Sequence, residues 1–470
     1  MMSQLRDTER KHRVAVIGGG LVGSLNAIFF ARNGYSVAVY ESRSDMRQEE
    51  QIAGRSINLA LSERGRKALR TVGLEDEVVN KFGIPMHGRM LHSHSGQTTI
   101  VPYGKPNEFL LSVDRRKLNE LLLSKAEQED DIVLEFKHKL LKVDLTDCQM
   151  VFSSPDGEIH DMADLVVGCD GAYSTVRKSF MRSIRFNFSQ TYILHGYKEL
   201  LMPAGDDGNY AMEKNYLHIW PRQTFMMIAL PNLDSTFTCT MFMPYDIFGT
   251  IKTQDDVLAF FEREFPDAIS LFGRDRLLET YMVNPVGPLI SIKCSPYHVE
   301  GRAVIMGDAA HAMVPFYGQG MNAGFEDCTI LHELIHKHGG NLDAALAEYT
   351  ETRNKDTAAI CDLAMYNYVE MRSLVASRWF RIKKKIDNFL NWLMPQTFTP
   401  LYTMVTFTSI PYEMAYRRWQ WQDKMIYRGL WCAAVTALVV PIAVIAYNWT
   451  EDHPWKARAL KYFVTKSLHR

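Results

Sequence analysis

The stretch VAVIGGGLVG, residues 14–23, decides the fold of this chain. Its first residues are small or β-branched and predict a short buried strand, and the glycines that follow have the spacing G-x-G-x-x-G. Glycines at this spacing permit a tight turn and let backbone N–H groups at the start of a helix approach a pyrophosphate. The sequence therefore predicts a dinucleotide site, and the residues expected in it are Gly18, Gly20, Leu21, Val22 and Gly23.

The residues after this turn favour the same interpretation. An apolar stretch that ends at Arg32 predicts a helix, and residues 35–40 predict a second strand that ends at Glu41. An acidic residue at the end of that strand can accept hydrogen bonds from ribose hydroxyl groups, and it would repel a 2′-phosphate. We therefore expect the bound adenosine to belong to FAD or NAD rather than to NADP.

Composition narrows the class of protein. The 470 residues, 47% hydrophobic and 23% charged, predict two or three globular domains, or one large domain with an insertion, and exclude a disordered or collagen-like chain. The net charge of −1 gives no electrostatic reason to expect nucleic-acid binding. The 7 cysteines form no CxxC pair and no Cys/His cluster, so neither a metal site nor a disulfide framework is predicted. The charged N-terminus does not resemble a secretory signal.

Two more turns follow short buried strands. Residues 165–167 run into Gly168-Cys169-Asp170-Gly171, and residues 304–306 run into Gly307-Asp308-Ala309-Ala310-His311. An Asp between a strand and a helix can hold a ribityl hydroxyl, and the helix N-terminus beyond it favours negative charge. We therefore expect the strands at 14–17, 37–40, 165–167 and 304–306 to share one sheet, with their turns at one edge.

Together these three turns resemble the FAD-dependent aromatic hydroxylases, the family that contains para-hydroxybenzoate hydroxylase. That family's second fingerprint is matched by Asp170, Gly171, Ser174 and Arg177, and its third by residues 307–311. Within the family the chain is most similar to the members that hydroxylate L-kynurenine, over residues 12–428. The stretches that carry this closer likeness are GRSINLALS at 54–62, residues 216–230, PFYGQGMN at 315–322, MYNY at 365–368 and PLYTM at 400–404. Tyr317 is a small departure, since Phe is usual there.

The resemblance implies an α/β fold, with a Rossmann-like FAD-binding domain and an inserted, mostly antiparallel substrate sheet. The implied segments are FAD-binding residues 1–190 (with substrate-contacting strands near 85–110) and 296–345, the substrate sheet at 191–295, helices at 346–428, a transmembrane helix at 429–447 and a polar tail at 448–470. It also implies tightly bound FAD, transient NADPH and O2 as co-substrates, and a flavin C4a-hydroperoxide that converts L-kynurenine to 3-hydroxykynurenine.

Residue roles follow from the same resemblance. The implied substrate contacts are Arg89, Tyr103, Phe316, Tyr317, Asn367 and Tyr402. The implied further cofactor contacts are Glu41, Arg115, Asp170, Gly171, Asp308, Gly320, Met321 and Asn322. Arg suits a buried carboxylate because its fork can bind two oxygens. No catalytic base is assigned, because the aniline nitrogen of kynurenine activates its own ring, and we interpret His311 as structural or beside the flavin.

The C-terminal sequence predicts a membrane anchor. Residues 429–447, GLWCAAVTALVVPIAVIAY, carry no charge, and at about 1.5 Å per residue a helix of this length matches a bilayer core. A buried helix in a homodimer interface is the alternative. The position near the C-terminus is typical of a tail anchor that leaves the catalytic part in the cytosol, and the resemblance implies the mitochondrial outer membrane.

Two other functions stay open on the sequence alone. One is a related flavin monooxygenase or epoxidase acting on another planar substrate. The other is a membrane-anchored flavin-binding interaction protein.

Overall fold

The structure is a computed structural model, and it describes residues 11–49, 58–105, 108–372 and 378–452. Residues 54–57 of the GRSINLALS stretch and most of the expected polar tail, from residue 453 on, lie outside the described residues. The chain divides into two compact units, residues 1–415 and residues 416–470.

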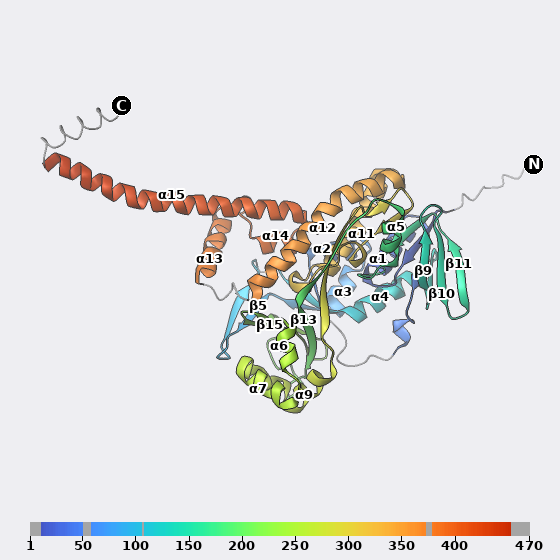
Figure 1. The fold of residues 1–470 in the computed structure, drawn as a ribbon, viewed down its shortest axis with the longest axis horizontal. Coiled ribbons are helices and arrows are strands. Elements are labelled where there is room, and N and C mark those ends of the chain that lie inside the picture. The colour runs from blue at the N-terminus through green and yellow to red at the C-terminus, as the bar shows by residue number, and fades with distance from the viewer. Residues whose placement is uncertain (1–10, 50–57, 106–107, 373–377, 453–470) are drawn as a thin grey trace, which may run out of the picture. The chain divides into compact units, whose positions relative to one another are not determined.

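A six-stranded sheet forms the first layer of the larger unit (Figure 1). Its order is β18-β19-β12-β1-β2-β8, and all neighbours are parallel except β18 and β19. The strands are β1 (Arg13–Ile17), β2 (Ser36–Glu41), β8 (Ile132–Phe136), β12 (Leu165–Gly168), β18 (His298–Val299) and β19 (Ala303–Ile305). The expected grouping of four distant strands is therefore confirmed. Ile17 pairs with Gly168 and Gly168 with Ile305, so the three strands end at the same edge.

Helices cover this sheet because their apolar residues form one continuous core with the strands. The helices that contribute to that core are α1 (Leu21–Arg32), α2 (Glu63–Thr71), α3 (Glu75–Lys81), α4 (Arg115–Glu127), α5 (Thr175–Ser183), α11 (Gly320–Lys337) and α12 (Leu342–Arg372). Two small antiparallel sheets complete this part. They are β3 (Asn58–Leu61), β7 (Leu110–Asp114) and β4 (Gly83–Met86), and β9 (Lys139–Asp144), β10 (Gln149–Ser154) and β11 (Gly157–Met162).

The second large sheet has seven strands in the order β17-β13-β16-β15-β14-β5-β6. Their bounds are β5 (Gly88–His92), β6 (Thr98–Pro102), β13 (Asn187–Met202), β14 (Leu217–Arg222), β15 (Phe225–Pro231), β16 (Phe237–Pro244) and β17 (Gly287–Ser295). All pairs are antiparallel except β14 with β5, where Leu217 pairs with Arg89. The sheet expected to contact substrate is thus built from two stretches of chain, because β5 and β6 come from within the first segment expected to bind FAD.

Residues 245–283, within the expected mostly antiparallel segment 191–295, form helices. The helices are α6 (Tyr245–Thr250), α7 (Gln254–Glu264), α8 (Pro266–Phe272) and α9 (Arg274–Val283). A capping box between Thr253 and Asp256 starts α7, and Pro266 occupies the first turn of α8, which are both helix-start signals. Their aromatic residues pack on the sheet in a second core, and Figure 1 shows α7 and α9 near β13 and β15.

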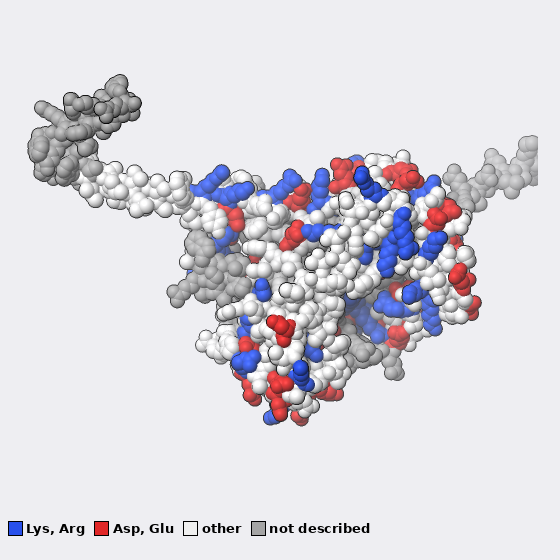
Figure 2. Space-filling view, viewed as in Figure 1, with Lys and Arg blue, Asp and Glu red and all other residues white. Residues whose placement is uncertain are grey.

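The remaining elements follow β19 and lead to the C-terminus. They are α10 (Asp308–His311), the short 3-10 helix η2 (Pro315–Tyr317), α13 (Arg378–Leu393), α14 (Leu401–Phe407) and α15 (Tyr412–Asp452). Among the described residues, α15 is the one helix long and apolar enough to cross a membrane, with a mean hydropathy of 1.9 in its most apolar window. Its apolar stretch carries no Lys, Arg, Asp or Glu in Figure 2.

Candidate active site

The glycine turn after β1 is closely packed against the turn after β12. Gly18 has a φ of +105°, and a Cβ there would lie 2.5 Å from the carbonyl oxygen of Cys169. A Cβ on Gly23 would lie 1.9 Å from the carbonyl oxygen of Gly18. Only glycine fits at these two positions. Helix α1 begins directly after Gly20 with no side-chain cap, so its first N–H groups are available to an anionic ligand.

Glu41 lies beside this turn at the end of β2. Its carboxylate accepts a hydrogen bond from the N–H of Gly19 at 2.9 Å and others from the backbone and guanidinium of Arg43. Burial alone would raise the pKa of Glu41, but the hydrogen bonds from Arg43 and Gly19 bring it below its ordinary value. A buried, ionised carboxylate at this place is suited to accept hydrogen bonds from a ribose.

Asp170 forms the second turn. One carboxylate oxygen, Oδ2, accepts hydrogen bonds from the N–H groups of Thr175 at 2.6 Å and Val176 at 3.2 Å, which begin α5. The other oxygen, Oδ1, is buried without a partner among the described residues. Gly171 has a φ of +76°. Arg177 donates to the carbonyl oxygens of Ala309 and Ala172, and so it ties this turn to the third one.

The third turn is held from inside the protein. The N–H of Gly307 donates to Asp327 at 2.9 Å, and the Nε2 atom of His311 lies 2.6 Å from the same carboxylate. Asp327 also binds the guanidinium of Arg353, and all three side chains are buried. His311 therefore supports the turn, whereas Asp308 is exposed at the start of α10.

The other expected cofactor residues differ in position and in their hydrogen bonds. Gly320 and Met321 begin α11, and Arg115 is exposed at the start of α4. The side-chain amide of Asn322 is hydrogen-bonded within the protein. Its oxygen accepts from the N–H of Ser62, and its nitrogen donates to the carbonyl oxygens of Ala60 and Gly318. The amide thus fixes the loop that precedes α11.

Taken as a site, the three turns fit a dinucleotide. Val22, in the first turn of α1, lies within van der Waals range of a Cβ built on Gly307, so the first and third turns adjoin. The uncapped helix start, the ionised Glu41 and the unpartnered oxygen of Asp170 supply the donors and acceptors that such a ligand requires.

A second group of expected residues surrounds Arg89. This side chain is 5% exposed, and its guanidinium carbon lies 4.4 Å from the centre of the Tyr402 ring. Tyr402 stacks on Tyr103 and on Tyr317, with ring centres 5.4 Å and 5.6 Å apart. Burial raises the pKa values of Tyr103 and Tyr317, so both hydroxyls stay neutral. Strand β6 ends beside Tyr103, η2 carries Tyr317 and α14 carries Tyr402, so three distant segments form one aromatic wall.

Phe316 and Asn367 shape the loop next to this wall. The Nδ2 atom of Asn367 donates to the carbonyl oxygen of Phe316 at 2.7 Å. Phe316 stacks on Tyr368, with ring centres 3.8 Å apart, and meets Phe242 edge-on. The amide nitrogen of Asn367 therefore positions η2, and the substrate contact that the resemblance implies for Asn367 stays a prediction.

Two charged residues that the sequence analysis did not single out lie beside Arg89. An oxygen of Glu370 is 3.8 Å from the Arg89 guanidinium. Burial lowers the pKa of Lys384, and the neighbouring Arg89 lowers it further. Glu370 is three residues after Asn367 on α12, so helical spacing was the one available signal for it. Lys384 comes from α13, and no local pattern indicates that α13 reaches this site.

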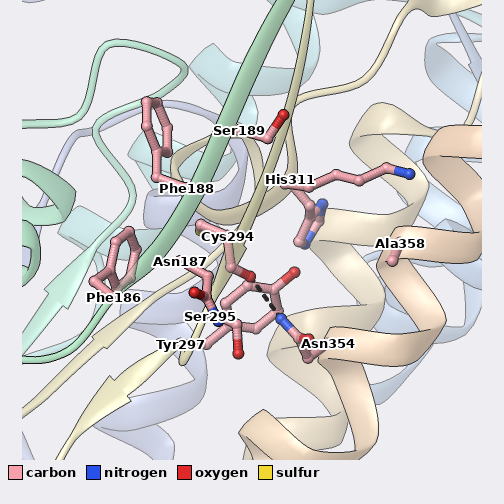
Figure 3. Close-up of a pocket in the computed structure, with 11 residues that line it drawn as sticks. Phe186, Asn187, Phe188, Ser189, Cys294, Ser295, Tyr297, His311, Asn354 and Ala358 are labelled. Atoms are coloured by element: carbon pink, nitrogen blue, oxygen red, sulfur yellow. Dashed lines mark hydrogen bonds between the residues drawn. The ribbon is translucent and has the colours of Figure 1, made fainter.

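A separate pocket of about 550 Å³ lies between the ends of β13 and β17 and helix α12 (Figure 3). His311 and Tyr297 line it, and Asn354 donates to the carbonyl oxygen of Cys294 at 2.6 Å. None of the residues around Arg89 lines this pocket.

Comparison with known proteins agrees with this geometry. A family model described as an FAD binding domain matches residues 11–364. Kynurenine 3-monooxygenase of Sus scrofa is 52% identical over 418 residues, which covers 89% of this chain and 88% of the relative. The protein of the same name from Anopheles gambiae is 52% identical over 440 residues, or 93% and 90% of the two chains. That from Caenorhabditis elegans is 45% identical over 454 residues, or 93% and 98%.

Solved structures share the fold at lower identity. The tetrameric form of 2-methyl-3-hydroxypyridine-5-carboxylic acid oxygenase aligns with a TM-score of 0.64 and 19% identity, over 77% of this chain and 93% of its own. p-Nitrophenol 4-monooxygenase from Pseudomonas putida aligns with a TM-score of 0.63 and 19% identity, over 81% and 94%. At this identity the likeness concerns the fold alone.

Proposed function

Because the chain belongs to the kynurenine 3-monooxygenase family of FAD-binding flavoprotein monooxygenases, we propose that it converts L-kynurenine to 3-hydroxykynurenine, with NADPH and O2 as co-substrates. The observation that carries this proposal is the buried guanidinium of Arg89 inside an aromatic wall. The wall includes η2, which leads directly into α11. Helix α11 carries Asp327, the residue that holds the third turn.

Arg89 would bind the carboxylate of the amino acid. Its Nε atom has no hydrogen-bond partner among the described residues, and its nearest carboxylate, on Glu370, is 3.8 Å away. A buried charge without a close partner is costly, so an anionic substrate group would stabilise it. Glu370 is then placed to receive the ammonium group of the same zwitterion.

The aromatic wall would hold the kynurenine ring and keep water away from it. Tyr103, Tyr317 and Tyr402 offer flat aromatic surfaces, and ring stacking of this kind favours a planar substrate. When bound, FAD would supply electron transfer from NADPH and the activation of O2. The side chains need only orient the aniline ring and exclude solvent, since the aniline nitrogen activates the carbon that is hydroxylated.

The C-terminal helix supports a membrane location. The apolar stretch of α15 fits a membrane anchor, and the likeness to the kynurenine hydroxylases points to the mitochondrial outer membrane with the catalytic unit facing the cytosol. A homodimer would be compatible with this location.

The test is substrate-dependent turnover by the full chain with FAD. Kynurenine should stimulate NADPH oxidation, and 3-hydroxykynurenine should form in proportion to the NADPH consumed. Equal NADPH oxidation with and without kynurenine would contradict the proposal. Stimulation by another planar compound, but not by kynurenine, would favour a related monooxygenase or epoxidase. Absence of any NADPH oxidation by a flavin-loaded protein would favour an interaction protein.

A further inference from the structure

Helix α13 carries an exposed apolar face. Four of its side chains are strongly exposed: Ile382 (50%), Phe389 (57%), Trp392 (77%) and Leu393 (56%). The last three lie seven, ten and eleven positions after Ile382. This spacing places them on one side of the helix. The rings of Phe389 and Trp392 lie 6.0 Å apart on that side. Tryptophan is usually well buried in soluble proteins, so a side chain this exposed calls for a partner.

The opposite face of α13 is already in use. Lys384 is largely buried, and burial together with the charge of Arg89 lowers its pKa. Lys383 pairs with Asp387 at 3.2 Å within the helix. Helical spacing puts Lys384 on the opposite side of α13 from three of the exposed apolar residues, Ile382, Phe389 and Leu393. These exposed side chains therefore face away from Lys384.

The composition of α13 indicates which kind of partner its exposed face would bind. The helix is rich in cations, at Arg378, Arg381 and residues 383–385, against a single acid, Asp387. A cationic helix that also exposes Trp, Phe and Leu is typical of segments that lie in the membrane interface. Lys and Arg near an anionic membrane surface add electrostatic attraction to the apolar contact.

The same chain also brings its own membrane anchor. The uncharged stretch that starts at Gly429 follows α13 closely in sequence, so an anchored chain keeps α13 near a bilayer. The high local concentration of lipid then favours a contact that would be weak for a free helix.

We propose that α13 lies on the membrane surface as a second, peripheral contact, with Ile382, Phe389, Trp392 and Leu393 among the lipid headgroups of an anionic bilayer. This inference rests on the proposed membrane anchoring by α15. It has a consequence for the Arg89 site, since the helix that carries Lys384, whose pKa Arg89 lowers, would then be held by lipid.

The test measures the depth of single labels in the reconstituted full chain. In a Cys432→Ser background, which removes the exposed cysteine and leaves the others buried or half-buried, a fluorophore is attached at Trp392→Cys, Val439→Cys or Val283→Cys. Val283, on α9, is 73% exposed and serves as a matched control. The vesicles contain phosphatidylcholine and phosphatidylserine, with a quencher fixed either near the headgroup or deep in the acyl chain.

The label at position 392 should be quenched about twofold or more above the control by the shallow quencher. The label at 439 should respond to the deep quencher. Quenching at 439 with none at 392 would overturn the inference and leave the anchor intact. No quenching at either position would overturn both. A label at 392 that is shielded from water but not quenched by lipid would show contact between two copies and would also overturn it.

A charge reversal tests the electrostatic part. Lys385 is exposed on α13, and Lys385→Glu should weaken quenching at 392 on vesicles that contain phosphatidylserine but not on neutral ones. Equal quenching of both variants on the anionic vesicles would contradict an anionic surface as the partner.

Discussion

The buried guanidinium of Arg89 lies against the ring of Tyr402 and 3.8 Å from an oxygen of Glu370, and this makes its loss measurable. Arg89→Ala should weaken kynurenine binding by about 2–5 kcal/mol, as expected when one partner of a buried charge pair is removed. FAD content should not change, because Arg89 belongs to the sheet of β5 and β14 and not to the flavin turns. Titration of the flavin spectrum with kynurenine measures both quantities.

The conservative variant separates charge from geometry. Arg89→Lys keeps the positive charge but loses the two-pronged donor, so its affinity should lie between those of the wild type and the alanine variant. Arg263→Ala, which removes a mostly exposed arginine on α7, is the control and should bind kynurenine normally. Loss of FAD from Arg89→Ala would show that the residue is structural.

The buried carboxylate of Asp327 should make the free energy of unfolding depend on pH in the acid range. Burial alone would raise its pKa, but His311 and Arg353 bring the pKa below its ordinary value of 3.8. A carboxylate with a lowered folded-state pKa stabilises the protein at neutral pH, and that stability is lost as the pH falls through the folded-state pKa. Asp327→Asn should therefore lower the free energy of unfolding at neutral pH by about 3–5 kcal/mol, because Arg353 loses a buried partner.

Denaturant unfolding at several pH values checks this prediction. The Asp327→Asn variant should lose less stability than the wild type when the pH is lowered. Asp206→Asn, at an exposed position, should follow the wild type throughout. An Asp327→Asn protein as stable as the wild type at neutral pH would contradict the structural role assigned to the carboxylate.

At the scale of elements, Arg64 on α2 fastens α14 to the flavin-binding layer. Its buried guanidinium donates to the carbonyl oxygens of Val405 and Ile410, pairs with Glu326, and lies 3.8 Å from the ring centre of Tyr412. Because α14 carries Tyr402, Arg64→Met should weaken kynurenine binding by about 1–3 kcal/mol, the cost of losing hydrogen bonds from a charged group.

A neighbouring lysine provides the control for Arg64. Lys67 lies on the same helix and forms an exposed pair with Glu333, so Lys67→Met should bind kynurenine as the wild type does. FAD content and unfolding measurements accompany both variants. Normal kynurenine affinity in a folded Arg64→Met protein would show that α14 stays in place without this arginine.

Elements also show what the sequence could and could not predict. Residues 14–41 follow a local pattern, strand, glycine turn, helix and strand, so their fold was predictable from spacing. The pairing of β5 with β14 joins segments far apart in the chain, and no local period encodes it. The same limit applies to side chains: that Asn322 and Asn367 bond to protein carbonyls depends on which distant loops meet them.

At the scale of the whole molecule, the proposed chemistry and the proposed anchor belong to different units. Every expected substrate and cofactor residue lies within residues 1–415, whereas the uncharged stretch of α15 lies in the unit that starts at Tyr416. This division predicts that removal of the anchor changes membrane attachment without removing any residue of the site.

Truncation before Lys424 tests that division. An inserted helix is effectively permanent, whereas one interfacial helix gives marginal and reversible binding. The truncated chain should therefore leave membranes during a high-salt wash, yet still float with phosphatidylserine vesicles at low salt through α13. Adding Phe389→Ser and Trp392→Ser should abolish that residual flotation, while the full-length chain with the same two changes should remain membrane-bound. A truncated protein that resists the salt wash would locate a second strong anchor upstream of Lys424.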